Sequence, residues 1–443
     1  MRFYDRKKEL ERLHQLRAVA FENHSQLVAL TGRRRIGKTS LILRSCEGTP
    51  TVYLFVSREN EAMLCRRFIR VIQQALPTCY VPESVDHFEE LFRILMEIGK
   101  QIAFNLVIDE FQEFYYINPS LYSLIQDCWD RLKDQTHICF IASGSVYTLM
   151  HRLFMDMKEP LYGRCDALMK LQPFETTVLK EILADYKPDY SSEDLLALYT
   201  FTGGVPKYIE NFVDHGSLSM EQMVDQMMQP DSIFQSEGKA LLIQEFGKKY
   251  GNYFAILSAI ANGDNTIPRL TQATGESGVT GHLKRLEEDY ELITKRRPIF
   301  AKEGTQTVRF EITDLFLRFW FRYFTKYSDL IEMGNLPLLG TLIKNDYPTY
   351  SGLTLEIYFR QQLRESLQFR NIGSWWQAKK EKDPCEIDIV AIYAENQQAL
   401  VAEVKRQRKN FKPGAFQEKV ATIRQKLLFD FKIEAKLLTM EDM

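Results

Sequence analysis

The chain has 443 residues, of which 45% are hydrophobic and 26% are charged, and its formal net charge is −2. This composition is typical of a folded globular protein, and the length suggests about three domains. A net charge so close to zero excludes a protein that is basic overall, so a nucleic-acid site would have to be a local patch.

The chain carries no signal of export or membrane insertion. Its first six residues lack the apolar core of a signal peptide, and no stretch approaches the roughly 18 uncharged apolar residues of a membrane span. The seven cysteines are scattered, and no pair has metal-ligand spacing. These features predict a reduced, cytoplasmic protein that does not enter a membrane.

The first strongly patterned segment is a strand, a loop and a helix between residues 27 and 43. Its loop has the P-loop pattern G-x-x-x-x-G-K-[ST], in which glycines let backbone N–H groups surround a polyphosphate. Lys38 is expected to reach the β- and γ-phosphates, and the Thr39 hydroxyl to bind Mg²⁺. The predicted nucleotide-binding residues are Gly32, Arg33, Arg34, Arg35, Ile36, Gly37, Lys38, Thr39 and Ser40.

An apolar strand over residues 104–108 ends in Asp109 and Glu110, the pattern known as Walker B. We expect Asp109 to hold Mg²⁺ and Glu110 to orient or deprotonate the attacking water. ATP and Mg²⁺ are therefore the predicted cofactors.

Three more strands, over 51–55, 137–142 and 167–171, are predicted to complete the sheet. The strand over 137–142 ends in Ser143-Gly144-Ser145, and either serine could lie near the γ-phosphate. Arg164 precedes a fifth strand over 167–171, where it either neutralises transition-state charge or forms a structural ion pair. Apolar strands alternating with helices predict an α/β fold with a parallel sheet that binds its ligand at the carboxyl ends of the strands.

Residues 172–245 are predicted to be helical, and residues 250–325 are predicted to form a small module of helices and strands. Two glycines and Pro206 interrupt the helical pattern of 172–245 and allow close backbone approach. Residues 250–325 give three short helices and a hairpin, the winged helix-turn-helix pattern, which serves either DNA or protein contacts. Its candidate DNA contacts are His282, Lys284 and Arg285 on the third helix and Lys295, Arg296 and Arg297 on the wing.

The C-terminal segment reads as a compact α/β unit. A helix over 354–368 carries Glu356, and two strands over 386–392 and 400–405 gather Asp388, Glu403 and Lys405 on one face. Two carboxylates can hold Mg²⁺ and a lysine can activate water, although an edge hairpin with solvated charges gives the same pattern. The basic run over 405–412 could bind a phosphate backbone, and Trp375 and Trp376 could stack on a base or simply pack.

Taken together, these motifs make the chain similar to the archaeal-type ATPases of the STAND group, relatives of AAA-type ATPases. The resemblance rests on the opening Phe3-Tyr4-Asp5-Arg6-x-x-Glu9, the P-loop, the two acids, Gly144-Ser145, the run 203–206 and the run 314–320. Asp5 stands where the family usually has glycine. The resemblance implies that Pro206 lies near the nucleotide and that the last domain is similar to PD-(D/E)XK nucleases, with Glu356, Asp388, Glu403 and Lys405 at the matching positions.

We therefore expect a P-loop ATPase core over 1–171, a helical lid over 172–245, a winged helix-turn-helix over 246–335 and a restriction-endonuclease-like α/β domain over 336–443. The expected function is an ATP-hydrolysing switch that couples nucleotide state to DNA binding and metal-dependent cleavage. An ATP-controlled DNA-binding or scaffolding protein with an inert nuclease-like domain is the alternative. A transport or chaperone motor would need an arginine acting in trans, which the sequence does not identify.

Overall fold

A computed structural model of the chain describes residues 1–145, 147–247, 250–275, 278–302, 304–305, 307–377, 385–395 and 397–443. The chain forms two compact units. One is Asp5–Gln172, and the other combines Met1–Tyr4 with Pro173–Met443. Within the described residues, no helix has both the length and the apolar character that crossing a bilayer requires.

The first unit is built on a five-stranded parallel sheet in the order β2-β3-β4-β1-β5. Every residue of β1, β3 and β4 is buried, as expected for strands covered on both faces. The strands are β1 (Gln26–Thr31), β2 (Thr51–Phe55), β3 (Phe104–Asp109), β4 (Ile138–Gly144) and β5 (Ala167–Lys170). The parallel sheet predicted from the apolar runs is therefore confirmed.

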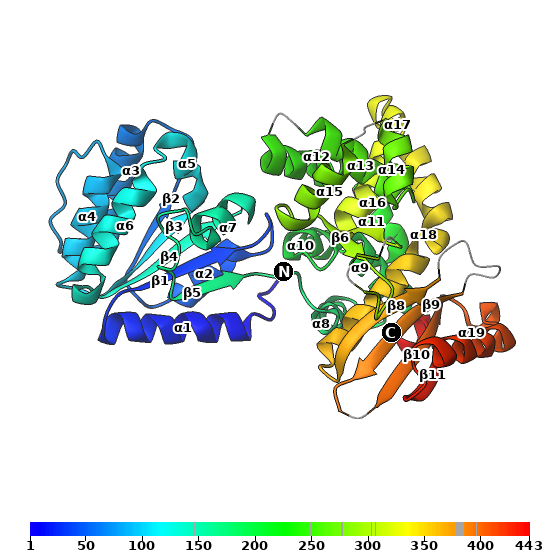
Figure 1. Cartoon of the computed structure of the whole chain (residues 1–443). Coiled ribbons are helices and arrows are strands. Elements are labelled where there is room, and N and C mark those ends of the chain that lie inside the picture. The colour runs from blue at the N-terminus through cyan, green and yellow to red at the C-terminus, as the bar shows by residue number, and fades with distance from the viewer. Residues whose placement is uncertain are drawn as a thin grey trace. The chain divides into compact units, whose positions relative to one another are not determined.

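Helices cover both faces of this sheet. Figure 1 shows α3, α4 and α6 on one face and α1 along the other. The region around 58–102 forms two helices, α3 and α4, and Pro77 and Pro82 lie in the segment between them, where a helix would be interrupted. The helices are α1 (Lys7–Glu22), α2 (Lys38–Cys46), α3 (Glu61–Ala75), α4 (Phe88–Gly99), α5 (Phe114–Ile117), α6 (Leu121–Leu132) and α7 (Tyr147–Met155).

The second unit begins with helices, as its sequence pattern predicts. Two of them start with capping boxes, in which Ser191 pairs with Asp194 and Ser219 with Gln222. The N-terminal segment joins this unit through Tyr4, whose hydroxyl donates to Asp185 Oδ2 over 2.6 Å. The helices are α8 (Thr176–Tyr186), α9 (Ser192–Thr202), α10 (Pro206–Asp214), α11 (Met220–Met227) and α12 (Ile233–Phe246).

Three helices and an antiparallel hairpin follow in the predicted order. The hairpin pairs Ile293 with Ile312 and Arg296 with Arg309. The aromatic-rich helix α16 and then α17 lead out of this segment. The elements are α13 (Gly251–Ala261), α14 (Ile267–Thr274), α15 (Val279–Glu288), β6 (Ile293–Arg296), β7 (Arg309–Ile312), α16 (Leu315–Trp320) and α17 (Ser328–Glu332).

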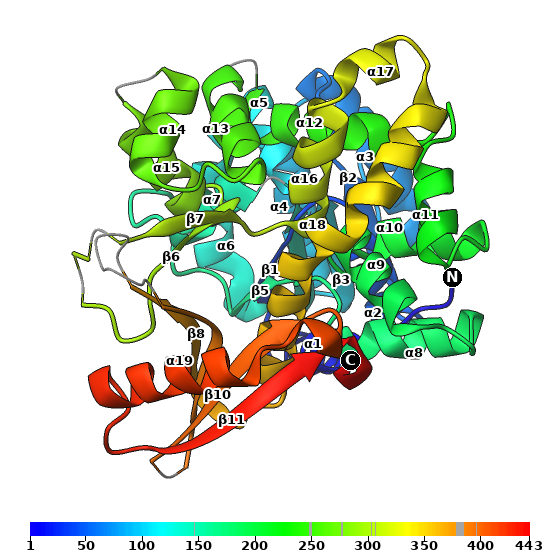
Figure 2. The same cartoon turned by 90° about the vertical axis from the view of Figure 1, so that its right-hand side faces the viewer.

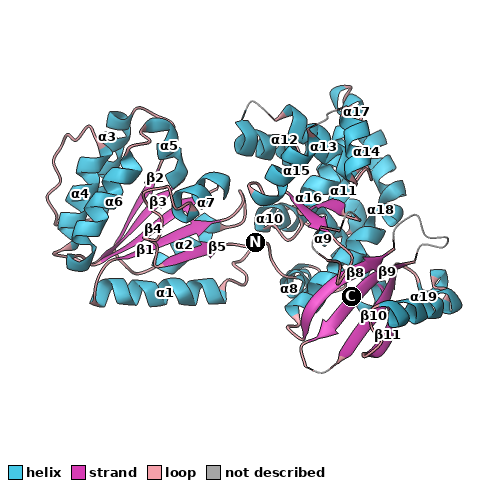
Figure 3. Cartoon of the chain, viewed as in Figure 1, coloured by secondary structure: helices cyan, strands magenta, loops and turns pink. Residues whose placement is uncertain are grey.

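The chain ends in a four-stranded sheet of order β11-β10-β9-β8, in which only the β10–β11 pair is parallel. The long helix α18 (Leu336–Glu365) leads into it, so the helix expected over 354–368 is the second half of a longer one. Phe416, Val420 and Ile423 of α19 pack against the sheet, which α19 crosses in Figure 2. Figure 3 shows this sheet and the small hairpin among the helices of the unit. The elements are β8 (Phe369–Trp376), β9 (Glu386–Tyr393), β10 (Gln398–Lys405), α19 (Pro413–Lys426) and β11 (Lys432–Thr439).

Candidate functional site

The P-loop connects the carboxyl end of β1 to α2 through two glycines in left-handed conformations. Gly32 has φ 148° and Gly37 has φ 91°, values that favour glycine. A Cβ on Gly32 would lie 3.1 Å from the carbonyl oxygen of Leu171. The Lys38 ammonium donates to the carbonyls of Gly32 (2.7 Å) and Arg33 (3.2 Å). Its positive charge therefore lies beside the backbone at the start of the P-loop.

The two predicted Mg²⁺ ligands of the first unit converge at the carboxyl edge of the sheet. The Thr39 hydroxyl lies 3.3 Å from Asp109 Oδ2, although the two residues come from different elements. The same carboxylate oxygen accepts a 2.5 Å hydrogen bond from Tyr53 of β2, a residue that the sequence did not indicate. Burial and then this hydrogen bond raise the pKa of Tyr53, so its hydroxyl stays a donor.

Glu110 is held at the same edge in a left-handed conformation with φ 55°. Its Oε2 accepts from Ser145 Oγ over 2.7 Å and from Gln112 Nε2 over 2.5 Å. Ser143 Oγ is buried and has no hydrogen-bond partner among the described residues. Of the two serines left open by the sequence, Ser145 is therefore the one that contacts Glu110.

Arg164 does not join this group of residues. Its guanidinium pairs with Asp130 over 3.1 Å, and it precedes the amino end of β5. Because β5 runs parallel to β1, Arg164 lies at the edge opposite the P-loop. The structural ion pair is thus the role that the structure supports, and the expected nucleotide contact is not formed within this unit.

Pro206 lies in the second unit, at the start of α10. The neighbouring Gly204 has φ 78°, and a Cβ there would come within 2.5 Å of the carbonyl oxygen of Phe174. The Phe174 N–H also donates to the Gly204 carbonyl over 2.8 Å. The glycines of this motif therefore allow close packing of two backbone segments, and the nucleotide contact of Pro206 stays a prediction.

The predicted C-terminal residues lie close together on β9 and β10. Lys405 Nζ is 2.9 Å from Glu403 and 3.7 Å from Asp388, and the Val404 N–H donates to Asp388 over 2.8 Å. Lys419 of α19, which the sequence did not indicate, also contacts Glu403 over 2.9 Å. Two lysines therefore share one of the two predicted metal ligands.

Burial and charge shift the pKa values of this group in opposite directions. Burial, and then repulsion from Asp388, raise the pKa of Glu356 to about 8. Burial also raises the pKa of Asp388. Burial alone would raise the pKa of Glu403, but hydrogen bonds from Lys405 and Lys419 lower it. At neutral pH the group therefore contains a largely neutral Glu356 beside a charged Glu403.

Asp388 and Glu403 alone supply too few ligands for a complete metal site. In the part of the chain that the structure describes, no three His, Cys, Asp or Glu side chains are arranged to hold a metal. Asp388 and Glu403 have the oxygen chemistry that Mg²⁺ prefers, but Glu403 would first have to leave Lys419.

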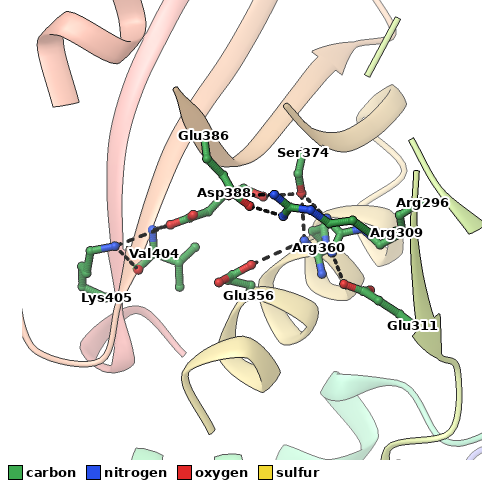
Figure 4. Close-up of polar contacts among 10 residues, drawn as sticks. All are labelled: Arg296, Arg309, Glu311, Glu356, Arg360, Ser374, Glu386, Asp388, Val404 and Lys405. Carbon is green, nitrogen blue, oxygen red and sulfur yellow. Dashed lines mark hydrogen bonds and ion pairs between the residues drawn. The ribbon is translucent and has the colours of Figure 1, made fainter. Parts of the chain in front are cut away.

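A second polar network joins the hairpin to the C-terminal sheet (Figure 4). Ser374 Oγ donates to the Asp388 carbonyl over 2.7 Å and accepts from Arg360 over 2.9 Å and from Arg296. Arg296 also pairs with Glu311, so its guanidinium makes internal contacts, and the DNA contact of the wing stays a prediction.

The two tryptophans also serve packing. Trp375 belongs to the buried core of the C-terminal sheet. The guanidinium of Arg309 lies over the Trp376 ring, 4.5 Å from its centroid. The alternative of a base-stacking platform is therefore not supported at either residue.

Part of the predicted basic surface remains exposed. Arg406 pairs with Glu193 over 2.6 Å and is thus removed from the basic run, and Lys405 is held as described above. His282 contacts the Tyr253 ring. The exposed basic residues of the two predicted DNA surfaces are Lys284, Arg285, Arg297, Arg408, Lys409 and Lys412.

Comparison with known proteins agrees with this architecture. Residues 3–212 match a family described as an ATPase domain predominantly from Archaea, and residues 320–415 match one described as archaeal and bacterial proteins of unknown function. The uncharacterized protein MJECL04 of Methanocaldococcus jannaschii is 30% identical over 413 residues, which cover 91% of this chain and 87% of that protein.

Two solved structures share the fold. The Walker-type ATPase paby2304 of Pyrococcus abyssi matches with a TM-score of 0.56 at 19% identity, covering 72% of this chain and 96% of its own. The ORC2 protein of Aeropyrum pernix matches with a TM-score of 0.50 at 15% identity, covering 75% and 95%. Given the relative that spans nearly the whole chain and the ATPase domain in its first half, the chain belongs to the family of archaeal-type ATPases.

Proposed function

We propose that this chain is an ATP-hydrolysing switch. The observation that carries the proposal is the convergence of Thr39, at the start of α2, with Asp109 and Glu110, at the carboxyl end of β3, beside the P-loop. In this role Lys38 binds the phosphates and Thr39 and Asp109 hold Mg²⁺, which neutralises phosphate charge when it is bound. Glu110 orients the attacking water or accepts its proton.

The family supports the nucleotide ligand. The matching domain is described as an ATPase, and the Aeropyrum pernix relative is a complex with ADPNP and ADP. The oxygen ligands Thr39 and Asp109 are few, but Mg²⁺ commonly keeps several waters and takes further ligands from the substrate phosphates.

Binding and hydrolysis can be separated by two variants. Lys38→Ala should weaken ATP binding by about tenfold or more, a loss of about 1.4 kcal/mol. Glu110→Gln should bind ATP normally but hydrolyse it at least about 100-fold more slowly than the parent, as expected for loss of a general base. Fluorescent-nucleotide titration and phosphate release measure the two steps. Unchanged hydrolysis in Glu110→Gln would contradict the assigned role.

A second proposal concerns the output of the switch. Lys405 Nζ lies within 4 Å of the carboxylates of both Asp388 and Glu403. This cluster favours metal-dependent phosphodiester cleavage. The hairpin module would then be a winged helix that binds double-stranded DNA through its exposed basic residues. The alternative is an inert domain in which the two lysines replace the metal charge, so that the chain binds DNA or a partner without cleaving it.

Cleavage of plasmid and linear DNA with Mg²⁺ or Mn²⁺, with and without ATP, distinguishes these outputs. An ATP-gated nuclease should lose cleavage in Asp388→Ala and lose the ATP effect in Lys38→Ala. Absence of cleavage in every condition, with ATP binding intact, would support the inert domain.

A further inference from the structure

Gln112 is a fully buried amide two residues beyond the catalytic candidate Glu110. It lies in the 3-10 turn Phe111–Glu113 that follows β3. The Tyr122 hydroxyl lies 3.1 Å from the Phe111 carbonyl and 3.3 Å from the Gln112 carbonyl, which anchors the turn to α6. The backbone of Gln112 is therefore held independently of its side chain.

The side chain of Gln112 is oriented by Glu110. Its Nε2 donates to Glu110 Oε2 over 2.5 Å, and the reversed amide would bring two acceptor oxygens together. Its Oε1 is buried and has no hydrogen-bond partner among the described residues. A Cβ on Gly144 would come within 2.3 Å of this Oε1, so the missing side chain of Gly144 makes room for the amide.

The hydrogen bonds on Glu110 fall on one of its two carboxylate oxygens. Oε2 receives the Gln112 amide, the Ser145 hydroxyl at 2.7 Å and the Ser145 N–H at 3.4 Å. Within the described part of the chain, Glu110 Oε1 receives none. A carboxylate anchored through one oxygen keeps the lone pairs of the other for a water molecule, and a fixed base is more effective than a mobile one.

We infer that Gln112 is a positioning residue for ATP hydrolysis, which acts by holding Oε2 of Glu110 so that Oε1 faces the attacking water. The inference rests on the proposed function. Gln112 exchanges no proton and touches no phosphate in this role. A purely structural role explains the amide less well, because an apolar side chain of the same length would fill the space without burying an unpartnered oxygen.

The variant Gln112→Met keeps the length of the side chain and removes both polar atoms. It should lower kcat by about tenfold or more, since small misplacements of reacting groups carry effects of up to about 100-fold. The nucleotide Kd should stay within about twofold of the parent, and Tm should be unchanged or higher. Gln101→Met, an exposed position of the same unit, is the matched control and should leave kcat unchanged.

A double variant tests whether Gln112 acts through Glu110. In a Glu110→Gln background, adding Gln112→Met should change kcat by less than about twofold, because the positioned base is already absent. A further large loss in that background, or an unchanged kcat in Gln112→Met alone, would overturn the inference. So would a loss confined to Tm and nucleotide affinity.

Single-turnover hydrolysis of bound ATP by the parent chain separates this inference from the proposed function. A parent that binds ATP and never hydrolyses it would overturn hydrolysis and the role of Gln112 together. A parent that hydrolyses ATP at the same rate as Gln112→Met would overturn the role of Gln112 alone.

Discussion

Glu356 is a single side chain whose charge should shape the pH dependence of stability. It lies on α18, and Arg360 is 3.7 Å from its carboxylate. Its pKa of about 8 lies well above its usual value of 4.5, first because of burial and then because of Asp388. Between these values the folded chain binds more protons than the unfolded chain, so this residue's contribution to stability is lost as pH rises from about 5 to about 8.

The variant Glu356→Gln tests this expectation, because its amide resembles the neutral acid at every pH. Relative to the parent, its free energy of unfolding in urea should rise between pH 5 and pH 9. Glu418→Gln, an exposed position on α19, should show the parent's pH dependence. Parallel curves for the parent and Glu356→Gln would show that the unfolded and folded chains hold this proton equally.

Sequence alone predicted the residues that form contiguous motifs, such as the P-loop and Asp109. It missed Tyr53, because this residue reaches Asp109 only through the pairing of β2 with β3. The same limit applies to Arg296, which was a candidate DNA contact, and to Arg164, for which a transition-state role and a structural ion pair both stayed open. Their acidic partners come from other segments of the chain, and residue type and spacing do not reveal such pairs.

At the level of elements, the contact between α12 and α16 depends on a glycine. A Cβ on Gly238 would lie 2.2 Å from the Trp320 ring, and the indole N–H is held by the Gln235 carbonyl at 3.0 Å. Gly238→Ala should therefore destabilise the chain by about 1–3 kcal/mol through overpacking, which opposes a gain of about 1 kcal/mol in helix propensity.

Gly352→Ala is the matched control for this substitution. Gly352 lies inside α18, and a Cβ there would meet no atom within 4 Å. We expect a gain of about 0.5–1 kcal/mol from reduced backbone entropy in the unfolded chain. Urea unfolding measures both variants. Equal stabilisation by the two substitutions would contradict the close packing of α12 on Trp320.

The elements themselves were predictable where one pattern dominated. The apolar runs of β1, β3 and β4 predicted strands because a sheet covered on both faces needs such runs. The first half of α18 was missed, since it contains Pro348, a residue that ordinarily ends or kinks a helix. Ile299, which follows the first strand of the hairpin, packs in the core of the C-terminal sheet. No local sequence pattern predicts this contact, because its partners lie far along the chain.

For the whole molecule, the question is whether nucleotide state reaches the second unit. The chain passes between the units at Tyr4–Asp5 and at Gln172–Pro173. Inside the first unit, Arg6 Nη2 donates to the Gln172 carbonyl over 2.7 Å and to the P-loop carbonyl of Ile36 over 3.4 Å. Both connecting segments are therefore tied to the P-loop by one guanidinium, which gives bound ATP a physical route to the connections.

Hydrogen exchange on the intact chain tests this route. At ATP concentrations about 100 times Kd, amides of 5–172 that exchange by opening the site should be protected about 100-fold. A switch also requires a coupling free energy between the units, so exchange within 173–443 should change in the parent and stay constant in Lys38→Ala. In Arg6→Gln we expect protection around the P-loop to persist and the response of 173–443 to shrink. Protection confined to 5–172 in the parent would mean that the isolated chain binds ATP without switching, and a full response in Arg6→Gln would place the coupling elsewhere.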